Sequence, residues 1–290
     1  MSRIAARFAQ LRAQDRGALI PFLEAWDPDP ATSMAILRGM PGAGADLIEI
    51  GMPFTDPMAD GPIIQAASKR ALAAGATVGR TLAMVRDFRT EDPATPVVLM
   101  GYLNPILSYG PERFCVDAAA SGVDGLIVVD LPTEEADLLV PHATANGIDI
   151  IRLVAPTTDD ARMPLVLNGS SGFVYYVSIT GITGTRTASA AELAAAMPRI
   201  RRVTDLPIAV GFGVRTPEQA AEAVRAGDAA VVASALIDTL FATLDGQGRA
   251  RPDTVRRVLD QVRALAEGVR GARVTEPARR EPERNPVVGA

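Results

Sequence analysis

Short, continuous runs of apolar residues recur along the chain, and longer amphipathic stretches separate them. The apolar runs do not alternate with polar residues, which is typical of parallel strands that are buried on both faces. They occupy residues 18–23, 47–51, 97–100, 126–129, 148–154, 173–177, 208–211 and 229–232. The pattern therefore predicts eight buried strands joined by helices.

The stretches between the runs carry the signals of helix ends. Thr216-Pro217-Glu218 is typical of a helix start, and Gly122 and Gly147 are typical of helix ends. The expected helices occupy residues 62–74, 111–121, 133–146, 188–202 and 216–226. Eight strands alternating with helices over about 250 residues match an α/β fold of the (β/α)8 TIM barrel type. A doubly wound sheet is the alternative, because periodicity does not show whether the sheet closes.

The two ends of the chain differ from this repeating pattern. Residues 2–14 predict an extra amphipathic N-terminal helix that would cover the bottom of the barrel. The C-terminal segment is rich in Pro, Arg and Glu and shows little apolar periodicity, which is typical of a disordered tail. We therefore expect a single catalytic barrel domain over residues 1–268 and a disordered tail over residues 269–290.

Composition narrows the functional classes. The chain has 290 residues, is 48% hydrophobic and carries a net charge of −5, which argues against a nucleic-acid or membrane-surface partner. Cys115 and His142 are the single residues of their types, which excludes an internal disulfide and a His/Cys metal cluster. No apolar run reaches the roughly 18 residues of a membrane span. We expect a cytoplasmic protein whose acid–base chemistry depends on Asp, Glu, Lys or Tyr.

One carboxylate interrupts the apolar run 47–51. Side chains alternate faces along a strand, so Glu49 should face the barrel axis while Ile48 and Ile50 face the outer helices. Barrel enzymes place their chemistry at the carboxyl ends of the strands. Desolvation there would raise the pKa of Glu49 and suit it to proton transfer near neutrality. The alternative is a structural glutamate paired with Lys or Arg.

The loop after this strand holds two more acids. Asp56 precedes a proline and Asp60 precedes a glycine, and both dipeptides are common turn formers. Asp60 is also placed to cap a helix that starts near Pro62. Local sequence alone therefore favours structural roles for both aspartates.

Three late turns predict a site for a phosphorylated ligand. They are the run 178–185, Gly211-Phe212-Gly213 and Ala233-Ser234, each directly after an expected strand. Glycine lets backbone N–H groups approach an anion, and phosphate sites recur after the late strands of barrels. The alternative is that glycine simply closes tight turns. The polar stretch 178–189 predicts either a mobile lid or an ordinary loop.

Several apolar and aromatic residues lie near strand ends and would line the pocket at the carboxyl end of the barrel. Tyr175 shares a face with Phe173 and should point into the barrel. A site role and ordinary core packing explain a tyrosine at this position equally well. The other candidates of this kind are Phe22, Met100, Tyr102 and Ile127.

The run Glu49–Pro62 closely resembles the signature of the tryptophan synthase alpha chain family. The resemblance continues through residues 100–105, 124–132, 178–184 and 211–213, and it covers roughly residues 1–268. It implies a (β/α)8 barrel that cleaves indole-3-glycerol phosphate to indole and glyceraldehyde 3-phosphate, a lyase reaction in tryptophan biosynthesis.

The resemblance also implies roles for matching residues. Glu49 would be the proton shuttle, Asp60 would hold the indole N–H, and Tyr175 would lie beside Glu49. Thr183 would hydrogen-bond Asp60 when the lid closes. The remaining substrate-binding residues would be Phe22, Met100, Tyr102, Ile127 and Phe212, with Gly184, Gly213, Ala233 and Ser234 near the phosphate.

The resemblance further implies a partner and no cofactor on this chain. Members of the family pair with a beta chain that carries pyridoxal phosphate, in an alpha2beta2 complex. The partner surface would include the loop 53–60 and the region of Asn104 and Pro105.

The chain departs from the family pattern in a few places. Where the family often has Thr-Ala-Gly-Asp-Pro, this chain has Glu24-Ala-Trp26-Asp-Pro, which adds a third acid and a bulky ring near the pocket. Ala233 replaces a common glycine. Two other functions stay open: a Schiff-base aldolase, which the single Lys69 in mid-helix disfavours, and a non-catalytic subunit that only activates a beta chain.

Overall fold

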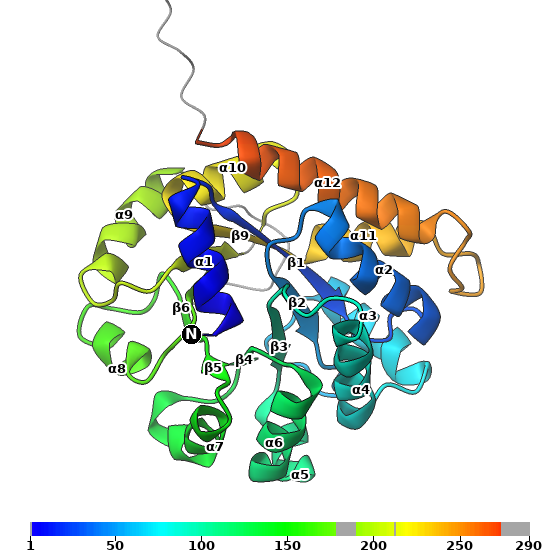
Figure 1. Ribbon diagram of the computed structural model, residues 1–290, viewed down its shortest axis with the longest axis horizontal. Coiled ribbons are helices and arrows are strands. Elements are labelled where there is room, and N and C mark those ends of the chain that lie inside the picture. The colour runs from blue at the N-terminus through cyan, green and yellow to red at the C-terminus, as the bar shows by residue number, and fades with distance from the viewer. Residues whose placement is uncertain (1, 178–189, 212, 274–290) are drawn as a thin grey trace, which may run out of the picture.

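A single sheet of parallel strands curves around the centre of the molecule, with helices outside it (Figure 1). The computed structural model describes residues 2–177, 190–211 and 213–273. The strands are β1 (Ala18–Glu24), β2 (Ile48–Gly51), β3 (Val97–Gly101), β4 (Gly125–Val128), β5 (Asp149–Ile150), β6 (Arg152–Val154), β7 (Val174–Val177), β8 (Ile208–Gly211) and β9 (Ala229–Val232).

The sheet closes into a barrel through one short stretch of chain. Its order is β5-β4-β3-β2-β1-β9-β8-β7-β6, so β5 and β6 form its two edges. Only Ile151 separates them in sequence, and its N–H donates to the Leu126 carbonyl at 3.0 Å. The predicted strand 148–154 therefore occupies a single position in the barrel. Its first part, β5, pairs with β4, and its second part, β6, pairs with β7. The (β/α)8 prediction is confirmed, and the doubly wound alternative is wrong because the two edges are continuous.

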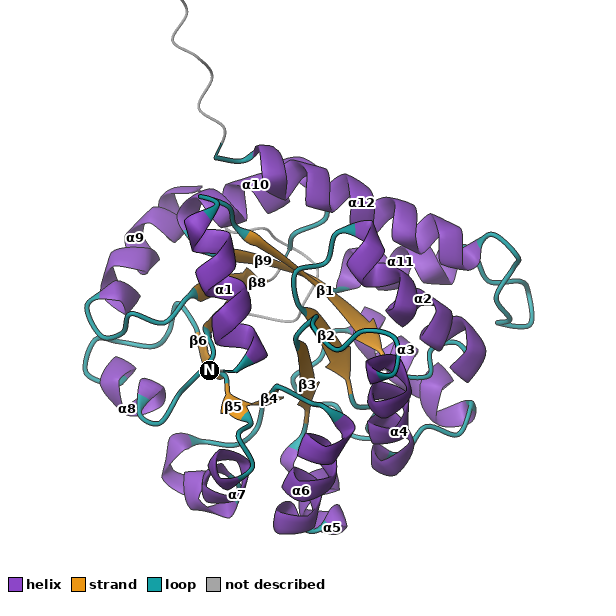
Figure 2. Cartoon of the chain, viewed as in Figure 1, coloured by secondary structure: helices purple, strands orange, loops and turns teal. Residues whose placement is uncertain are grey.

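Helices enclose the barrel, with α1 over one end and the others around the outside of the strands (Figure 2). They are α1 (Arg3–Ala13), α2 (Pro30–Ala43), α3 (Pro62–Ala73), α4 (Val78–Arg89), α5 (Leu103–Tyr109), α6 (Pro111–Ser121), the 3-10 helix η1 (Thr133–Leu138), α7 (Val140–Ala145), α8 (Met163–Leu167), α9 (Ala190–Arg201), α10 (Pro217–Ala226), α11 (Ser234–Ala242) and α12 (Thr254–Gly271).

Most of the expected helices agree with these bounds, but the expected helix 133–146 does not. The chain instead forms η1 and α7, with Leu139 in a non-helical conformation between them. Pro141 explains the break because it has no N–H with which to continue the hydrogen-bond ladder from η1, yet it suits the first turn of a new helix.

Helix α1 covers one end of the barrel, as the amphipathic pattern predicts (Figure 1). Its apolar residues Ile4, Phe8 and Leu11 are buried among the side chains that fill the barrel interior. The ring of Phe8 lies 5.9 Å from that of Phe173, centroid to centroid. The helix therefore seals the interior at this end by the ordinary burial of apolar surface.

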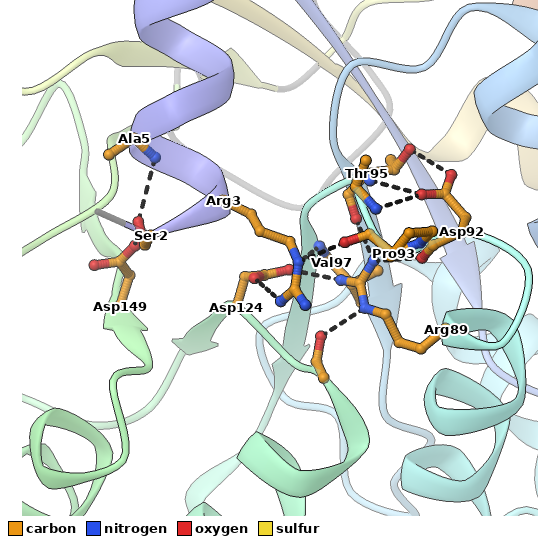
Figure 3. Close-up of polar contacts among 12 residues, drawn as sticks. Ser2, Arg3, Ala5, Arg89, Asp92, Pro93, Thr95, Val97, Asp124 and Asp149 are labelled. Atoms are coloured by element: carbon orange, nitrogen blue, oxygen red, sulfur yellow. Dashed lines mark hydrogen bonds and ion pairs between the residues drawn. The ribbon is translucent and has the colours of Figure 1, made fainter.

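Polar contacts fix α1 to the starts of the strands (Figure 3). Arg3 pairs with Asp124 at 2.8 Å, and Arg89 pairs with the other oxygen of the same carboxylate at 2.6 Å. Ser2 donates to Asp149 at 2.6 Å. Because Asp124 and Asp149 lie at the amino ends of β4 and β5, α1 occupies the end opposite the carboxyl rim, and the rim stays open for a site.

Helix α12 runs beyond the end that we expected for the barrel domain. It continues to Gly271, and Val269 is buried in the layer between sheet and helices. The helix extends this far because its apolar stripe still faces the core there. The prediction of a disordered tail concerns residues that lie mostly outside the described part of the chain.

Candidate active site

Glu49 faces the interior of the barrel from strand β2. Its neighbours Ile48 and Ile50 pack against the surrounding helices, whereas Leu47, on the face of Glu49, packs in the interior cluster. Parallel pairing places Glu49 beside Phe22 on one side and Val98 on the other. The alternation of side chains along the strand thus gives the inward orientation that the sequence predicts.

The carboxyl group of Glu49 is buried and poorly satisfied. The residue is 1% exposed, and its Oε2 atom has no hydrogen-bond partner among the residues that the structure describes. Burial raises the pKa of Glu49 to about 8, and the nearby charge of Asp60 adds to the rise. A buried polar atom without a partner is costly. Such an oxygen is free to contact a molecule bound in the barrel mouth, and no Lys or Arg of the described residues forms an ion pair with Glu49.

Asp60 reaches the same site from the loop between β2 and α3. It is 7% exposed, and burial raises its pKa to about 6 while a hydrogen bond from the Tyr102 side chain works in the opposite direction. The Tyr102 hydroxyl also accepts the Ala59 N–H at 3.0 Å. Asp56 differs, because its side chain is exposed and its carbonyl accepts the Met58 N–H within the turn. Of the two loop acids, only Asp60 belongs to the site.

Tyr175 approaches the two acids from strand β7. It packs in the interior cluster with Phe173, whereas Tyr176 packs in the outer layer. Burial raises the pKa of its phenol well above the ordinary value, and Glu49 and Asp60 add to the rise. A Cβ atom on Gly211 would lie 2.2 Å from the Tyr175 hydroxyl. Glycine on β8 therefore leaves the space that the ring occupies.

Apolar side chains surround this group of polar residues. Phe22 is 2% exposed and packs with Ile64 and Ile237, and Ile127 is fully buried in the interior. Met100 is half-buried and touches both of these clusters. Tyr102 is buried beside Phe54, with ring centroids 5.5 Å apart. Of the four predicted wall residues, Phe22, Met100 and Ile127 lie on strands β1, β3 and β4, and Tyr102 directly follows β3.

The predicted phosphate end is described only in part. Gly213 follows β8 with a φ of +77°, a conformation that favours glycine. Ala233 precedes α11, and Ser234 is its first residue, so the unpaired N–H groups of a helix start lie after β9. Thr183, Gly184, Phe212 and the predicted lid 178–189 lie outside the described residues.

Helix α3 carries two polar residues that the sequence did not single out, and they bind the Asp60 loop and the end of β1. Gln65 donates from its side chain to the Asp60 carbonyl at 2.8 Å. Ser68 donates to a carboxyl oxygen of Glu24 at 2.6 Å. Ser68 falls on the buried face of α3 with Ile64 and Ala71. A hydroxyl at such a helical position needs a partner, and that is the signal that would have identified it.

Neither a metal-binding group nor a membrane span is found where the structure can be described. No set of three His, Cys, Asp or Glu side chains within residues 2–177, 190–211 and 213–273 is arranged to hold a metal ion. None of the helices in these ranges is both long and apolar enough to cross a membrane. Lys69 is exposed on α3, away from the barrel interior that a Schiff-base lysine would need.

Comparisons with known proteins agree with this arrangement. The sequence model of the family described as tryptophan synthase alpha chain matches residues 8–270. The tryptophan synthase alpha chain of Granulibacter bethesdensis is 74% identical over 275 residues, which cover 95% of this chain and 99% of that protein. That of Acidiphilium cryptum is 69% identical over 273 residues, which cover 94% and 99%.

Solved structures give the same result. The crystal structure of tryptophan synthase subunit alpha from Legionella pneumophila superposes with a TM-score of 0.84 at 36% identity, covering 93% of this chain and 98% of that one. A structure of Mycobacterium tuberculosis tryptophan synthase superposes with a TM-score of 0.83 at 36% identity, with the same coverage.

Proposed function

Because the chain belongs to the tryptophan synthase alpha chain family, we propose that Glu49, Asp60 and Tyr175 are the groups with which it performs that family's reaction. The alpha chain is a lyase of tryptophan biosynthesis that cleaves indole-3-glycerol phosphate to indole and glyceraldehyde 3-phosphate. The observation that carries the residue assignment is the buried Oε2 atom of Glu49, which has no partner in the described part of the chain.

Glu49 transfers protons in both directions. With a pKa of about 8 it is largely a carboxylic acid at neutral pH, so it donates a proton to C3 of the indole ring. The resulting carboxylate then takes the proton of the adjacent glycerol hydroxyl. The C–C bond breaks, its electron pair returns to the ring, and indole and the aldehyde separate. Glu49 ends the cycle protonated, so the atoms balance without another acid or base.

Asp60 stabilises the charge that the first proton transfer creates. Protonation at C3 places positive charge on the indole N–H, and a carboxylate next to it is most useful at that moment. The pKa of about 6 leaves Asp60 mainly ionised at neutral pH, whereas Glu49 stays mainly protonated. Two carboxyl groups whose environments separate their pKa values in this way suit a division into acid and anion.

The remaining site residues orient the substrate. The apolar wall of Phe22, Met100 and Ile127 suits a planar indole ring, and Tyr102 holds the loop of Asp60. We assign the phosphate to the backbone N–H groups of Gly213, Ala233 and Ser234, together with Gly184 and Phe212, and we assign Thr183 to the lid that covers the ligand. The glycine turn and the start of α11 after the late strands support this assignment.

The test is an indole-release assay on indole-3-glycerol phosphate with Glu49→Gln. Removal of a general acid–base group typically costs about 10² to 10⁴ in rate, so turnover should fall by at least that range while substrate binding is largely kept. Glu112→Gln, an exposed acid on α6, is the matched control and should retain the wild-type rate. Full activity of Glu49→Gln would remove the shuttle assignment.

The partner that we propose is a beta chain in an alpha2beta2 complex. A pocket of about 600 Å³ opens beside the barrel rim and is lined by residues of both predicted partner regions, including Pro53, Phe54, Asn104 and Pro105. Met58, on the same loop, is 79% exposed, so an apolar side chain is available to a partner at this surface.

Sedimentation of the chain with a cognate beta chain tests this complex. We expect a heterotetramer, with association weakened by Met58→Asp and not by a charge placed on the distant α12. Association that is insensitive to Met58→Asp would place the interface elsewhere.

We further propose that the chain works in the cytoplasm without a cofactor of its own and that pyridoxal phosphate belongs to the partner. The division into a catalytic domain and a tail at residue 268 stays a prediction.

A further inference from the structure

A third buried carboxyl group lies beside the site and has no role in the mechanism above. Glu24 ends strand β1, is 3% exposed and pairs in register with Gly51 at the end of β2. A Cβ atom on Gly51 would lie 2.1 Å from Glu24 Oε2 and 2.5 Å from the Phe22 ring. The Glu24 side chain therefore occupies the space that a glycine provides on the strand of Glu49.

Glu24 connects this strand end to helix α3. Ser68, itself 3% exposed on α3, donates to Glu24 Oε1 at 2.6 Å. Three residues earlier on the same helix, Gln65 donates to the Asp60 carbonyl at 2.8 Å. A continuous path of two side-chain hydrogen bonds and one helical turn thus runs from the end of β1 to the backbone of Asp60.

The charges around Glu24 indicate that it makes this contact as a neutral acid. Burial raises its pKa to about 8, and Asp60 and Asp27 add to the rise, while Ser68 and Arg70 oppose it. Arg70 is already engaged with Asp27 through two hydrogen bonds of 2.7 Å. At neutral pH Glu24 is therefore mainly an uncharged hydrogen-bonding group, and it adds little negative charge next to Asp60.

We propose that Glu24 is a positioning residue for Asp60, which it holds in place by joining strand β1 to helix α3 through Ser68. This inference rests on the role of Asp60 in the proposed function. Because small displacements of a catalytic group are costly, a loosened α3 lowers the rate without removing any group that touches the substrate.

The first experiment compares four single variants in the indole-release assay. Glu24→Ala removes the contact, and kcat/KM should fall on the order of tenfold or more, mainly through kcat. Glu24→Gln keeps a neutral group of the same size that accepts the Ser68 hydroxyl, and it should restore most of the rate. Ser68→Ala should lower kcat/KM in the same direction as Glu24→Ala. Ser33→Ala is the matched control.

Ser33 suits this purpose because it is also a fully buried serine. It accepts the Trp26 N–H at 2.9 Å in the β1–α2 loop and donates to Met84 on α4, so neither of these hydrogen bonds reaches α3. Ser33→Ala should lower thermal stability and leave kcat/KM near the wild-type value. Comparable rate losses in Ser33→Ala and Ser68→Ala would overturn the proposal, as would a Glu24→Ala variant that is folded and fully active.

The second experiment places Glu24→Ala in an Asp60→Asn background. If Glu24 acts through Asp60, its removal there should change kcat/KM by no more than about twofold, because residues that act through one another are not additive. An undiminished loss in this background would overturn the positioning role. If Asp60→Asn alone leaves the rate unchanged, the proposed function of Asp60 fails instead. Ser68→Ala in both backgrounds gives the same comparison if Glu24→Ala does not fold.

Discussion

The Tyr102 hydroxyl holds the carboxylate of Asp60 from the end of strand β3. It forms a hydrogen bond with the Asp60 side chain and accepts the Ala59 N–H at 3.0 Å, so one phenol orients both the acid and its backbone. Burial alone would raise the pKa of Asp60 further, and the Tyr102 hydrogen bond limits the rise to about 6. The tyrosine therefore keeps Asp60 ionised near neutral pH.

Substitution Tyr102→Phe should move the acidic limb of the pH–rate profile to higher pH. The variant loses the donor that stabilises ionised Asp60, so the pKa of Asp60 rises and more of the enzyme is inactive at pH 6 to 7. The measurement is kcat/KM for indole release from pH 5 to 9. Tyr176→Phe, on the outer face of β7, is the control. An acidic limb at the wild-type position in Tyr102→Phe would contradict the effect.

The wild-type enzyme should show a bell-shaped profile of kcat/KM against pH. Asp60 must be ionised, which sets the acidic limb near its pKa of about 6, and Glu49 must be protonated, which sets the alkaline limb near its pKa of about 8. The alkaline limb should persist in Glu24→Gln, since it reports Glu49. A profile that stays flat up to pH 9 would be inconsistent with proton donation by Glu49.

Folding stability should decrease as pH rises from about 5 to 9. The pKa values of Glu24 and Glu49 are raised from 4.5 to about 8 in the folded chain, so between these pH values the folded protein binds protons that the unfolded chain has released. By linkage, their contribution is fully present below 4.5 and is lost as pH rises through 8.

Glu24→Gln and Glu49→Gln cannot ionise, so each should reduce this loss. Each variant should be more stable than wild type above pH 8, by on the order of a few kcal/mol. Denaturant unfolding at pH 5, 7 and 9 provides the measurement, with Glu112→Gln as the exposed control. Equal pH slopes in wild type and both site variants would show that folding does not raise the pKa of either carboxyl group.

Trp26 combines a strained backbone with a side chain that stabilises the fold by packing and by a cation–π contact. Its φ of +74° lies in the left-handed region that favours glycine, while Arg80 lies 5.3 Å above its ring. Trp26→Gly should relieve about 1 kcal/mol of strain but lose about 2 to 3 kcal/mol of ring burial and cation–π contact.

The net effect should be a destabilisation of about 1 to 2 kcal/mol, and Trp26→Ala should be worse by about 1 kcal/mol because it keeps the strain. Urea unfolding of both variants measures the difference. If alanine is the better substitute, the left-handed backbone at this position is not what limits the replacement.

The sequence by itself determined the strands, most of the helices and the direction of Glu49. These features depend on residues that are neighbours in the chain: continuous apolar runs mark strands buried on both faces, and alternation along 47–51 turns Glu49 inward. The long run from Glu49 to Pro62 also carried the family resemblance, and with it the reaction.

Tertiary structure alone decided how these elements meet. The sheet closes into a barrel because its two edge strands, β5 and β6, are joined directly through Ile151. The apolar periodicity of the sequence does not show this connection. The contact of Glu24 with Ser68 spans 44 residues, and that of Tyr102 with Ala59 spans 43. Local patterns encode burial and backbone conformation, whereas such partners are set by strand register and helix packing. For the same reason Glu24 was visible in the sequence as an extra acid, but its partner was not.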